Sequence, residues 1–339
     1  MKAKFGYFLI ILALPLISGC IMDQLLVIGN YNAPKTKARS IQKAQSGEFK
    51  QYYDNGQLKK IGMLHKGKTI GEWKMYHANG QLKQIVNFKD GKKSGAFKFY
   101  NQNGMLQKSG FYVDDKRSGE WRIFTEKGTV KLIGQYENDV EVDQFKWFDK
   151  KGKLDKAGFY KNGQPHGDWK HYHTNGQIKE VGKFEEGKKV GLFKWFRQNG
   201  MIEKTGFYNQ SVPSGEWKSY YANKNLKEIG KYQKGKMNGE FKWYYPNGRL
   251  HKSGNYKLGR ADGIWKAYHR NQELKEIGHF VDNKSHGEFK WYHFNGKLKK
   301  VGHYDHGKVT GDWKLFSEQG TLQKVIAYKN GQWIEKESH

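Results

Sequence analysis

Apolar and polar residues alternate along this chain in a pattern that recurs at one fixed interval, with its first three copies opening at Gly47, Gly71 and Gly95. Each of twelve copies follows G-E-(F/W)-K-x-(Y/F)-x-x-N-G-x-L-x-x-x-G-x-Y-x-x-G-K, with Gly opening eleven copies and Asp143 opening the fifth. Alternation with a period of two predicts β-strands. Asn-Gly between two such runs predicts a hairpin, because both residues tolerate the positive φ of a type I′ turn.

The strict spacing predicts one repeated architecture rather than several unrelated domains. No insertion interrupts the twelve copies, so every hairpin is expected to contact its neighbours through the same surfaces. We therefore expect an all-β fold, an elongated twisted antiparallel meander or solenoid of about twelve 24-residue β-hairpin repeats over residues 47–334. About 24 strands at roughly 4.8 Å each give a length on the order of 115 Å, and such a sheet must twist.

An aromatic side chain stands two residues after the opening position in all twelve copies, and its type alternates between Phe and Trp. In the later Phe copies a Trp follows two residues on, as in Phe241 and Trp243, whereas the Trp copies vary there, as in Trp265 and Ala267. This alternation of large and smaller residues suits packing between hairpins and implies an effective period of two repeats. A Gly on the second strand, such as Gly254, is expected to make room for a neighbouring ring. We interpret these rings as core.

The composition agrees with an aromatic, strand-rich fold. Among 339 residues there are 42 Gly, 21 Tyr, 20 Phe and 11 Trp, and hydrophobic residues account for 36%. A helical bundle would need stripes of Leu and Ala, and a disordered chain would lack this aromatic surface. The formal net charge of +28 favours anionic partners.

The beginning of the chain differs from the repeats and predicts a targeting signal. Lys2 and Lys4 form a short basic region, and an apolar run covers residues 5–16. This order is typical of a secretory signal peptide, which we assign to residues 1–19. The apolar run is too short for a permanent membrane span.

The end of this signal resembles the bacterial lipobox. Its residues are Ile17-Ser18-Gly19-Cys20, and Cys20 is the only cysteine of the chain. The resemblance implies that Cys20 carries lipid. Residues 20–46 have no clear periodicity and contain a basic run, so we assign them as an acylated, basic tether, and we assign residues 335–339 after the repeats as a C-terminal tail. Ile21 rather than Asp follows the cysteine, which by analogy with enteric bacteria favours the outer membrane, on its periplasmic or its surface side.

Two recurring segments, Y-x-x-G-K-x-x-G-E-(F/W) and N-G-x-L, carry a likeness to a known repeat. Residues 232–241 and Asn175-Gly176-x-Ile178 are examples. They resemble MORN (membrane occupation and recognition nexus) repeats, most closely the bacterial variant, over about residues 47–334. The resemblance implies a long hairpin sheet used for scaffolding, protein binding or membrane association, and some bacterial relatives carry an antitoxin label.

A basic residue stands three positions after every opening residue and defines a candidate binding surface. Because side chains alternate between the faces of a strand, the aromatic residue two positions further on shares that face. The candidate binding residues are Lys146, Lys170, Lys194, Lys218, Lys242, Lys266, Lys290, Tyr220, Tyr244, Tyr268 and Tyr292. Cations about 10 Å apart and interleaved with rings could hold a polyanion such as lipid phosphates or an envelope polymer.

The same surface has a simpler interpretation as a solvated face. Glu or Asp precedes the basic residue by two positions in eight copies, and exposed ion pairs of this kind contribute about 0–1 kcal/mol. A second column of charges alternates in sign from copy to copy, which also favours a hydrated surface. Its members are Lys156, Glu180, Lys204, Glu228, Lys252, Glu276 and Lys300.

The sequence contains no constellation that predicts catalysis. His171 and His173 share a face, and His303 and His306 flank a predicted turn, but no third metal-ligating residue recurs at a suitable spacing. Neither a Ser/His/Asp order nor a phosphate loop stands out. We therefore expect no catalytic residue, no metal and no cofactor.

These observations favour a non-enzymatic, lipid-anchored protein of the cell envelope. Its repeat sheet is expected to bind a protein, an anionic envelope polymer or lipid, and the lipid on Cys20 to contact the membrane. Nucleic acid is not an expected partner, and the oligomeric state is open. The first alternative is a toxin-neutralising, antitoxin-like protein that binds an acidic partner, and a cell-wall-active enzyme is a weaker one.

Overall fold

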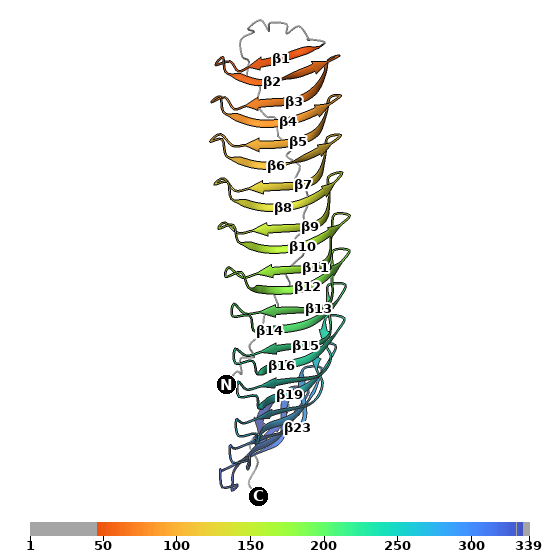
Figure 1. The fold of residues 1–339 in the computed structure, drawn as a ribbon. Helices are drawn as coiled ribbons and strands as arrows, with labels where there is room; N and C mark the ends of the chain where they lie inside the picture. The colour runs from red at the N-terminus through yellow and green to blue at the C-terminus, as the bar shows by residue number, and fades with distance from the viewer. Residues whose placement is uncertain (1–45, 330, 335–339) are drawn as a thin grey trace. The chain divides into compact units, whose positions relative to one another are not determined.

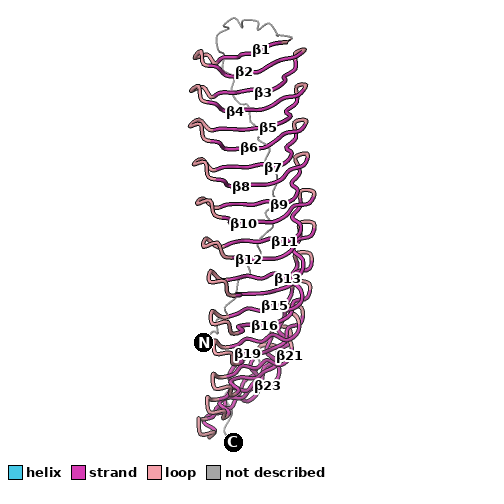
Figure 2. Tube along the Cα trace, viewed as in Figure 1, coloured by secondary structure: helices cyan, strands magenta, loops and turns pink. Residues whose placement is uncertain are grey.

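The computed structural model describes residues 46–329 and 331–334, which form one open antiparallel β-sheet (Figure 1). The described residues contain 27 strands, which follow one another like the rungs of a ladder (Figure 2). No helix among them is long and apolar enough to cross a membrane. The predicted all-β fold of hairpin repeats is confirmed. The predicted signal peptide, Cys20, the tether up to residue 45 and the C-terminal tail lie outside the described residues.

Each repeat supplies a first and a second strand, and two of the first strands are divided by a short break. The first strands are β1 (Gly47–Tyr52), β3 (Lys68–Tyr76), β5 (Lys92–Tyr100), β7 (Lys116–Phe124), β9 (Val140–Phe148), β11 (Gln164–Tyr172), β13 (Lys188–Phe196), β15 (Val212–Tyr220), β17 with β18 (Lys236–Met237 and Gly239–Tyr244), β20 with β21 (Arg260–Ala261 and Gly263–Tyr268), β23 (Lys284–Tyr292) and β25 (Lys308–Phe316). The second strands are β2 (Leu58–His65), β4 (Leu82–Lys89), β6 (Leu106–Val113), β8 (Val130–Glu137), β10 (Leu154–Lys161), β12 (Ile178–Glu185), β14 (Ile202–Asn209), β16 (Leu226–Gln233), β19 (Leu250–Lys257), β22 (Leu274–Val281), β24 (Leu298–Asp305) and β26 (Leu322–Lys329), followed by β27 (Gln332–Ile334).

Each first strand after β1, divided or not, pairs with the second strands before and after it, so the sheet is a simple meander. In the ninth repeat Phe241 of β18 lies opposite Gly254 of β19. Lys252 of β19 lies opposite Trp243 of β18 on one side and Ala267 of β21 on the other. The same register recurs from repeat to repeat, as the strict spacing of the sequence predicts.

The Gly that opens each sequence repeat lies within or beside the first strand rather than in a turn. β3, for example, begins at Lys68, three residues before Gly71. Gly71 has a φ of 65°, and Asp143 at the equivalent position has a φ of 57°. This left-handed conformation favours Gly, and Asp is one of the side chains that tolerate it best. The replacement therefore leaves β9 continuous.

The two ends of the hairpins use different turns, and the type I′ turn predicted at Asn-Gly is wrong. In the loop 245–249 only Gly248 has a positive φ, 84°, and its N–H donates to the carbonyl of Tyr245 at 2.9 Å. The N–H of Tyr245 also donates to the carbonyl of Arg249 at 2.8 Å, so the three residues between them form a loop in which a type I turn is followed by a left-handed Gly. Two consecutive positive φ values occur at the opposite end, as in Leu258 (50°) and Gly259 (90°). The I′ turns therefore join one hairpin to the next. Asn-Gly did not determine the turn type, because it is accepted both by I′ turns and by three-residue loops.

Aromatic rings on one face of the sheet form the core, and glycines of the preceding hairpin make room for them. A Cβ built on Gly230 would lie 2.2 Å from the ring of Phe241, and one on Gly254 would lie 2.0 Å from that of Trp265. The predicted roles of ring and glycine are both confirmed. Of the twelve Phe and Trp rings that stand two residues after an opening position, ten are buried, namely Trp73, Phe97, Trp121, Phe145, Trp169, Phe193, Phe241, Trp265, Phe289 and Trp313.

The predicted period of two repeats is visible in the stacking of these rings. Trp243 stacks on Trp265 with ring centroids 5.7 Å apart and planes inclined by 23°. Ala267 then follows where the previous copy carries a Trp, so a large residue alternates with a small one. Equivalent Trp pairs recur at 147 and 169, 195 and 217, and 291 and 313.

A second set of hydrogen bonds joins equivalent turns of successive hairpins at the Asn-Gly end of the sheet. The hydroxyl of Tyr245 donates to the carbonyl of Tyr268 at 2.8 Å. The Nδ2 amide of Asn271 donates to the carbonyl of Phe294 at 2.7 Å. Each bond spans 23 residues, so these side chains fix the distance between neighbouring turns and give this end of the sheet a regular edge.

Candidate functional site

The basic residues that stand three positions after each opening residue form a column, the basic column, on the face of the sheet opposite the aromatic core. Lys242 in β18 lies between Ile229 of β16 and Ser253 of β19 across the strands. Across the strands, aliphatic or small side chains thus separate neighbouring cations. The expected interleaving of cations with aromatic rings is wrong in the direction perpendicular to the strands. The register places the other predicted lysines on the same face, namely Lys146, Lys170, Lys194, Lys218, Lys266 and Lys290.

Several cations of this face form an ion pair with the acidic residue two positions earlier. The ion pairs include Lys218–Glu216 at 2.5 Å, Lys242–Glu240 at 2.9 Å and Lys290–Glu288 at 2.6 Å. The hydrogen bond and charge of Glu240 raise the pKa of the Lys242 ammonium. These pairs support the interpretation as a solvated face, because each cation already has its counter-charge. Lys146, Lys194 and Lys266 follow Gln144, Leu192 and Ile264 instead.

The four predicted tyrosines lie at the Asn-Gly end of the first strands. Their backbone carbonyls accept the hydrogen bonds of the preceding turn, as Tyr268 does from Tyr245 and Tyr244 does from Tyr221. The carbonyls of Tyr220 and Tyr292 accept equivalent contacts from Arg197 and His269. Only the side chains of Tyr244 and Tyr292 line one of the hollows described below.

The column of alternating charge is half-buried on the aromatic face, so the prediction of a hydrated surface is wrong. Lys252 Nζ lies 5.9 Å from the ring centroid of Trp243 and 4.5 Å from that of Trp265. Cation–π attraction of this kind contributes about 0.5–2 kcal/mol. Burial lowers the pKa of each lysine that packs on a Trp pair, namely Lys156, Lys204, Lys252 and Lys300.

Lys252 shares the aromatic face with Gly254, two residues further along the strand, and a β-bulge separates it from the residues before it. Tyr244 lies opposite Leu250, whereas Trp243 lies opposite Lys252, so His251 is the extra residue of the second strand. Without the bulge, Lys252 would share the outer face with Leu250. The extra residue brings the charged side chain to the aromatic face instead.

Two hollows at the Asn-Gly end are built from equivalent residues two repeats apart. The Trp243 hollow has a volume of about 370 Å³ and is lined by Tyr221, Lys227, Trp243, Tyr244, His251, Lys252 and Tyr256. The Trp291 hollow has a volume of about 210 Å³ and is lined by His269, Lys275, Trp291, Tyr292, Lys299 and Lys300. Both hollows share a Trp and a Tyr on the first strand of their repeat, together with three basic side chains on its second strand and the second strand before it.

The basic groups of the two hollows influence one another. The imidazole of His251 packs on the ring of Tyr245 with centroids 4.3 Å apart. Burial lowers the pKa of His251, and the charges of Lys275 and Lys252 lower it further. A bound anion would relieve this repulsion, and the ring of Trp243 offers an apolar surface beside it.

Equivalent positions in earlier repeats lack this concentration of charge. The position of His251 is taken by Glu203 two hairpins earlier and by Asp155 four hairpins earlier. Alternation along the sequence does not single out Lys227 and Lys275, because they stand at the bulge, where alternation does not define a face. The period of two repeats was the signal that could have found them.

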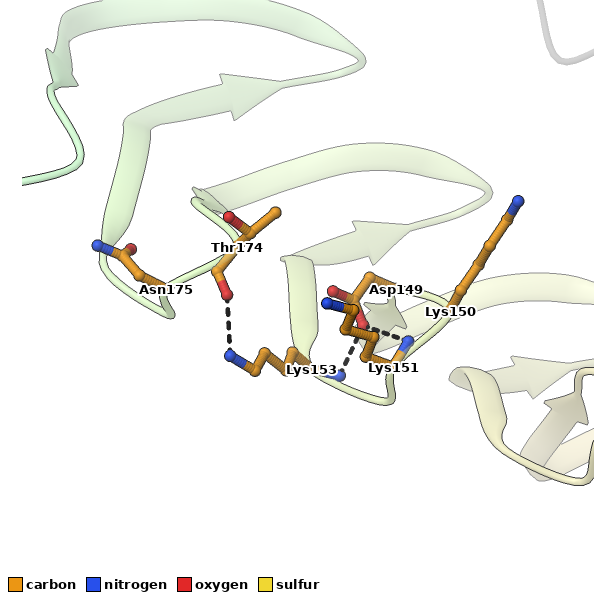
Figure 3. Close-up of a pocket in the computed structure, with 6 residues that line it drawn as sticks. All are labelled: Asp149, Lys150, Lys151, Lys153, Thr174 and Asn175. Carbon is orange, nitrogen blue, oxygen red and sulfur yellow. Dashed lines mark hydrogen bonds between the residues drawn. The ribbon is translucent and has the colours of Figure 1, made fainter.

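A further hollow, of about 520 Å³, lies between two turns, where its polar groups stabilise the loops. Asp149 Oδ1 accepts hydrogen bonds from the backbone N–H groups of Lys151 and Lys153 at 2.8 and 2.9 Å. Lys153 Nζ donates to the carbonyl of Thr174 at 3.1 Å, and the side chain of Lys150 extends away from the others (Figure 3). We do not regard this hollow as a binding site.

The histidines considered in the sequence analysis do not come together in pairs. His171 is half-buried on the aromatic face, opposite Lys156 and Glu180. His173 Nε2 lies 2.8 Å from the carbonyl of Phe196, where it joins two turns. His306 lies close to two ligand-type residues, one of them from the previous strand, which spacing within a single turn could not reveal.

Comparison with known proteins identifies a family for this chain, and the similar solved structures share little sequence with it. No curated protein matches the chain. Alternansucrase in complex with isomaltononaose is 13% identical, with 82% of this chain and 18% of that chain covered and a TM-score of 0.20. The TcdB2-TccC3 structure is 13% identical, with 84% of this chain and 18% of that chain covered and a TM-score of 0.17. The GtfA/B complex bound to UDP and GlcNAc is 18% identical, with 37% of this chain and 22% of that chain covered and a TM-score of 0.13. The chain spans about a fifth of the length of these structures, and the low TM-scores carry no functional argument.

The family assignment rests on eight of the twelve hairpins. The family described as MORN repeat variant matches residues 45–65, 70–90, 93–114, 165–186, 189–210, 213–234, 237–258 and 285–306. These segments make up half of the chain, and they coincide with hairpins that share one register. The chain therefore belongs to the MORN repeat variant family.

Proposed function

We propose that this chain is a non-enzymatic binding protein that holds an anionic polymer of the cell envelope along its repeats. The observation that carries the proposal is the recurrence of the Trp243 hollow and the Trp291 hollow with equivalent linings. Lysine side chains attract phosphate or carboxylate groups, and the indole ring offers a flat apolar surface to a sugar ring.

The spacing of the two hollows supports a polymer rather than a small anion. They are separated by four strands, which corresponds to about 19 Å. A chain with regularly spaced charges can occupy both hollows, and the second contact is then intramolecular, which raises the overall affinity. Affinity should therefore increase with polymer length until both hollows are spanned.

The proposal is tested by titrating polyglycerol phosphate of graded length into the full-length chain, with neutral dextran as the reference. We expect binding that strengthens with length and weakens with salt. The double variant Lys227→Gln/Lys275→Gln should lose about tenfold or more in affinity, since two charges leave the hollows. The control Lys131→Gln/Lys179→Gln removes the same charge from equivalent positions of earlier repeats and should bind like the parent.

Three outcomes would count against this proposal. Equal binding of dextran would exclude charge recognition, and equal losses in the two double variants would exclude the hollows as the site. Salt-dependent binding without any dependence on length would exclude simultaneous occupation of both hollows. In that case the acidic surface of a partner protein would become the favoured ligand.

We also propose that lipid on Cys20 holds the protein in the envelope, with the outer membrane as its location. The support is the order of basic residues, apolar run and lipobox-like segment at the start of the sequence. Cells grown with a labelled fatty acid should label the parent protein but not Cys20→Ser. Label retained by Cys20→Ser would contradict the anchor, and it would leave the polymer proposal to be judged by its own titration.

A further inference from the structure

We propose that His286, Asp305 and His306 form a binding site for a divalent transition-metal ion of the Zn²⁺ class. His286 belongs to β23, Asp305 ends β24, and His306 lies in the turn that follows. One ligand atom from each residue lies within 4.8 Å of the other two. The site is independent of the polymer-binding hollows, because it lies at the opposite ends of the strands.

The three side chains converge on a small volume. Asp305 Oδ1 lies 3.7 Å from His286 Nδ1 and 2.5 Å from His306 Nδ1. The two imidazole rings have centroids 4.7 Å apart. Ligand atoms around a tetrahedral Zn²⁺ ion lie about 3.3 Å from one another, given bonds of about 2.0–2.2 Å. The observed separations therefore approach those of a coordinated set.

The side chains also have the freedom to complete the geometry. Asp305 and His306 are 67% and 62% exposed, so small rotations about their side-chain bonds can bring both donors to an ion. His306 has a φ of 44° and precedes Gly307 in a tight turn, which holds its backbone beside the end of β24. The ion would thus bind to side chains that move on a backbone that is fixed.

One nitrogen of this group has no hydrogen-bond partner in the described part of the chain. It is His286 Nδ1, which is buried. A buried polar atom of this kind is unfavourable and requires an explanation. It lies 3.7 Å from Asp305 Oδ1, so a metal ion bound between these atoms would satisfy the nitrogen while the carboxylate supplies compensating negative charge.

The donor set selects the class of ion. Two imidazoles and one carboxylate suit Zn²⁺, Co²⁺ or Ni²⁺, whereas Mg²⁺ and Ca²⁺ prefer sites made wholly of oxygen atoms. The next imidazole, that of His279 in β22, has its centroid 6.5 Å from that of His286. It is too distant for direct ligation in this arrangement, so water would take the fourth position.

The trio belongs to one repeat, which provides a matched control within the chain. The equivalent positions of the sixth repeat are His166, Glu185 and Glu186. That repeat keeps the histidine on the strand but lacks the histidine in the turn. Its variant His166→Ala removes an imidazole from the same structural position without touching the proposed site.

The site is tested by calorimetric titration of Zn²⁺ into the purified full-length chain, in parallel with His286→Ala, His306→Ala and His166→Ala. We expect the parent and His166→Ala to bind one more Zn²⁺ ion than His286→Ala, or to bind it at least about tenfold more tightly. Co²⁺ should give visible absorption typical of tetrahedral coordination in the parent and in His166→Ala, and lose it in the other two. Circular dichroism checks that all four chains are folded.

The outcomes that overturn the proposal are equally definite. The site does not exist if the parent fails to bind Zn²⁺. It also does not exist if His286→Ala and His306→Ala match the parent in stoichiometry, affinity and Co²⁺ absorption. Equal losses in His166→Ala and His286→Ala would place the metal on scattered surface histidines and would equally exclude this site.

Discussion

The indole ring of Trp265 lies against the α-carbon of Gly254 on the neighbouring strand, so closely that a Cβ there would come within 2.0 Å of the ring. The same relationship joins Gly230 to Phe241 and recurs in most repeats. The described residues form a single sheet, which can bury a core in this way because each ring lies flat on the backbone of the preceding hairpin. The core is therefore a property of successive repeats rather than of a single hairpin.

This contact predicts a large effect from one added methyl group. Gly254→Ala should destabilise the sheet around it by about 1–3 kcal/mol, because the buried ring of Trp265 must move. Hydrogen exchange of the backbone amides in β19 and β21 measures the local loss. Ser253→Ala, one residue away on the opposite face, should change exchange little. The pair Gly254→Ala/Trp265→Leu should lose less than the sum of its single variants, and simple additivity would contradict the contact.

The turns predict a stabilising substitution. Lys224 has a φ of 70° at the position where most repeats carry a Gly, as at Gly248 with 84°. A left-handed residue with a Cβ costs roughly 1–2 kcal/mol, part of which Gly recovers in the folded state. Lys224→Gly should therefore raise the free energy of unfolding by about 0.5–1 kcal/mol, and the reciprocal Gly248→Lys should lower it. Thermal unfolding of the two variants checks the sign, and a lower melting temperature in Lys224→Gly would reject strain as the reason.

The sequence predicts a residue's position best where a single local pattern determines it. The positions of Phe241 and Gly254 follow from the fixed period of the repeats and from the need for space beneath a ring, and the structure agrees. The half-burial of Lys252 does not follow, since it depends on the rings of Trp243 and Trp265, which belong to two neighbouring strands. Residues that meet across hairpins, such as His286 and Asp305, have no local rule at all. Their proximity depends on the register of the whole sheet.

The half-buried carboxyl of Glu228 predicts a dependence of stability on pH. Burial raises its pKa above the ordinary value of 4.5, although a hydrogen bond from Trp243 opposes this. The folded chain then holds the proton at pH values where the unfolded chain releases it. The contribution of Glu228 to stability is therefore complete below pH 4.5 and is lost as the pH rises through the raised pKa.

Removal of this charge should consequently stabilise the protein in neutral solution. Glu228→Gln should unfold at a higher temperature than the parent at neutral pH, and the difference should disappear in acid. Glu240→Gln is the control, because Glu240 is exposed and pairs with Lys242, so its loss should cost no more than about 1 kcal/mol. A gain for Glu228→Gln that is the same at every pH would show that ionisation is not its cause.

The outer lysine column and the two hollows predict different effects on polymer binding. Lys218, Lys242 and Lys290 each hold an acidic partner within 3 Å, so a polyanion must compete with that partner for every one of them. The triple variant of these lysines to Gln should change the affinity for polyglycerol phosphate by less than about threefold. Replacement of Lys227, Lys275 and Lys299 by Gln removes the same charge from the hollows and should abolish most of the salt-dependent affinity. Equal losses in the two triple variants would mean that net charge alone attracts the polymer, and a larger loss in the outer column would move the binding surface to the face opposite the aromatic core.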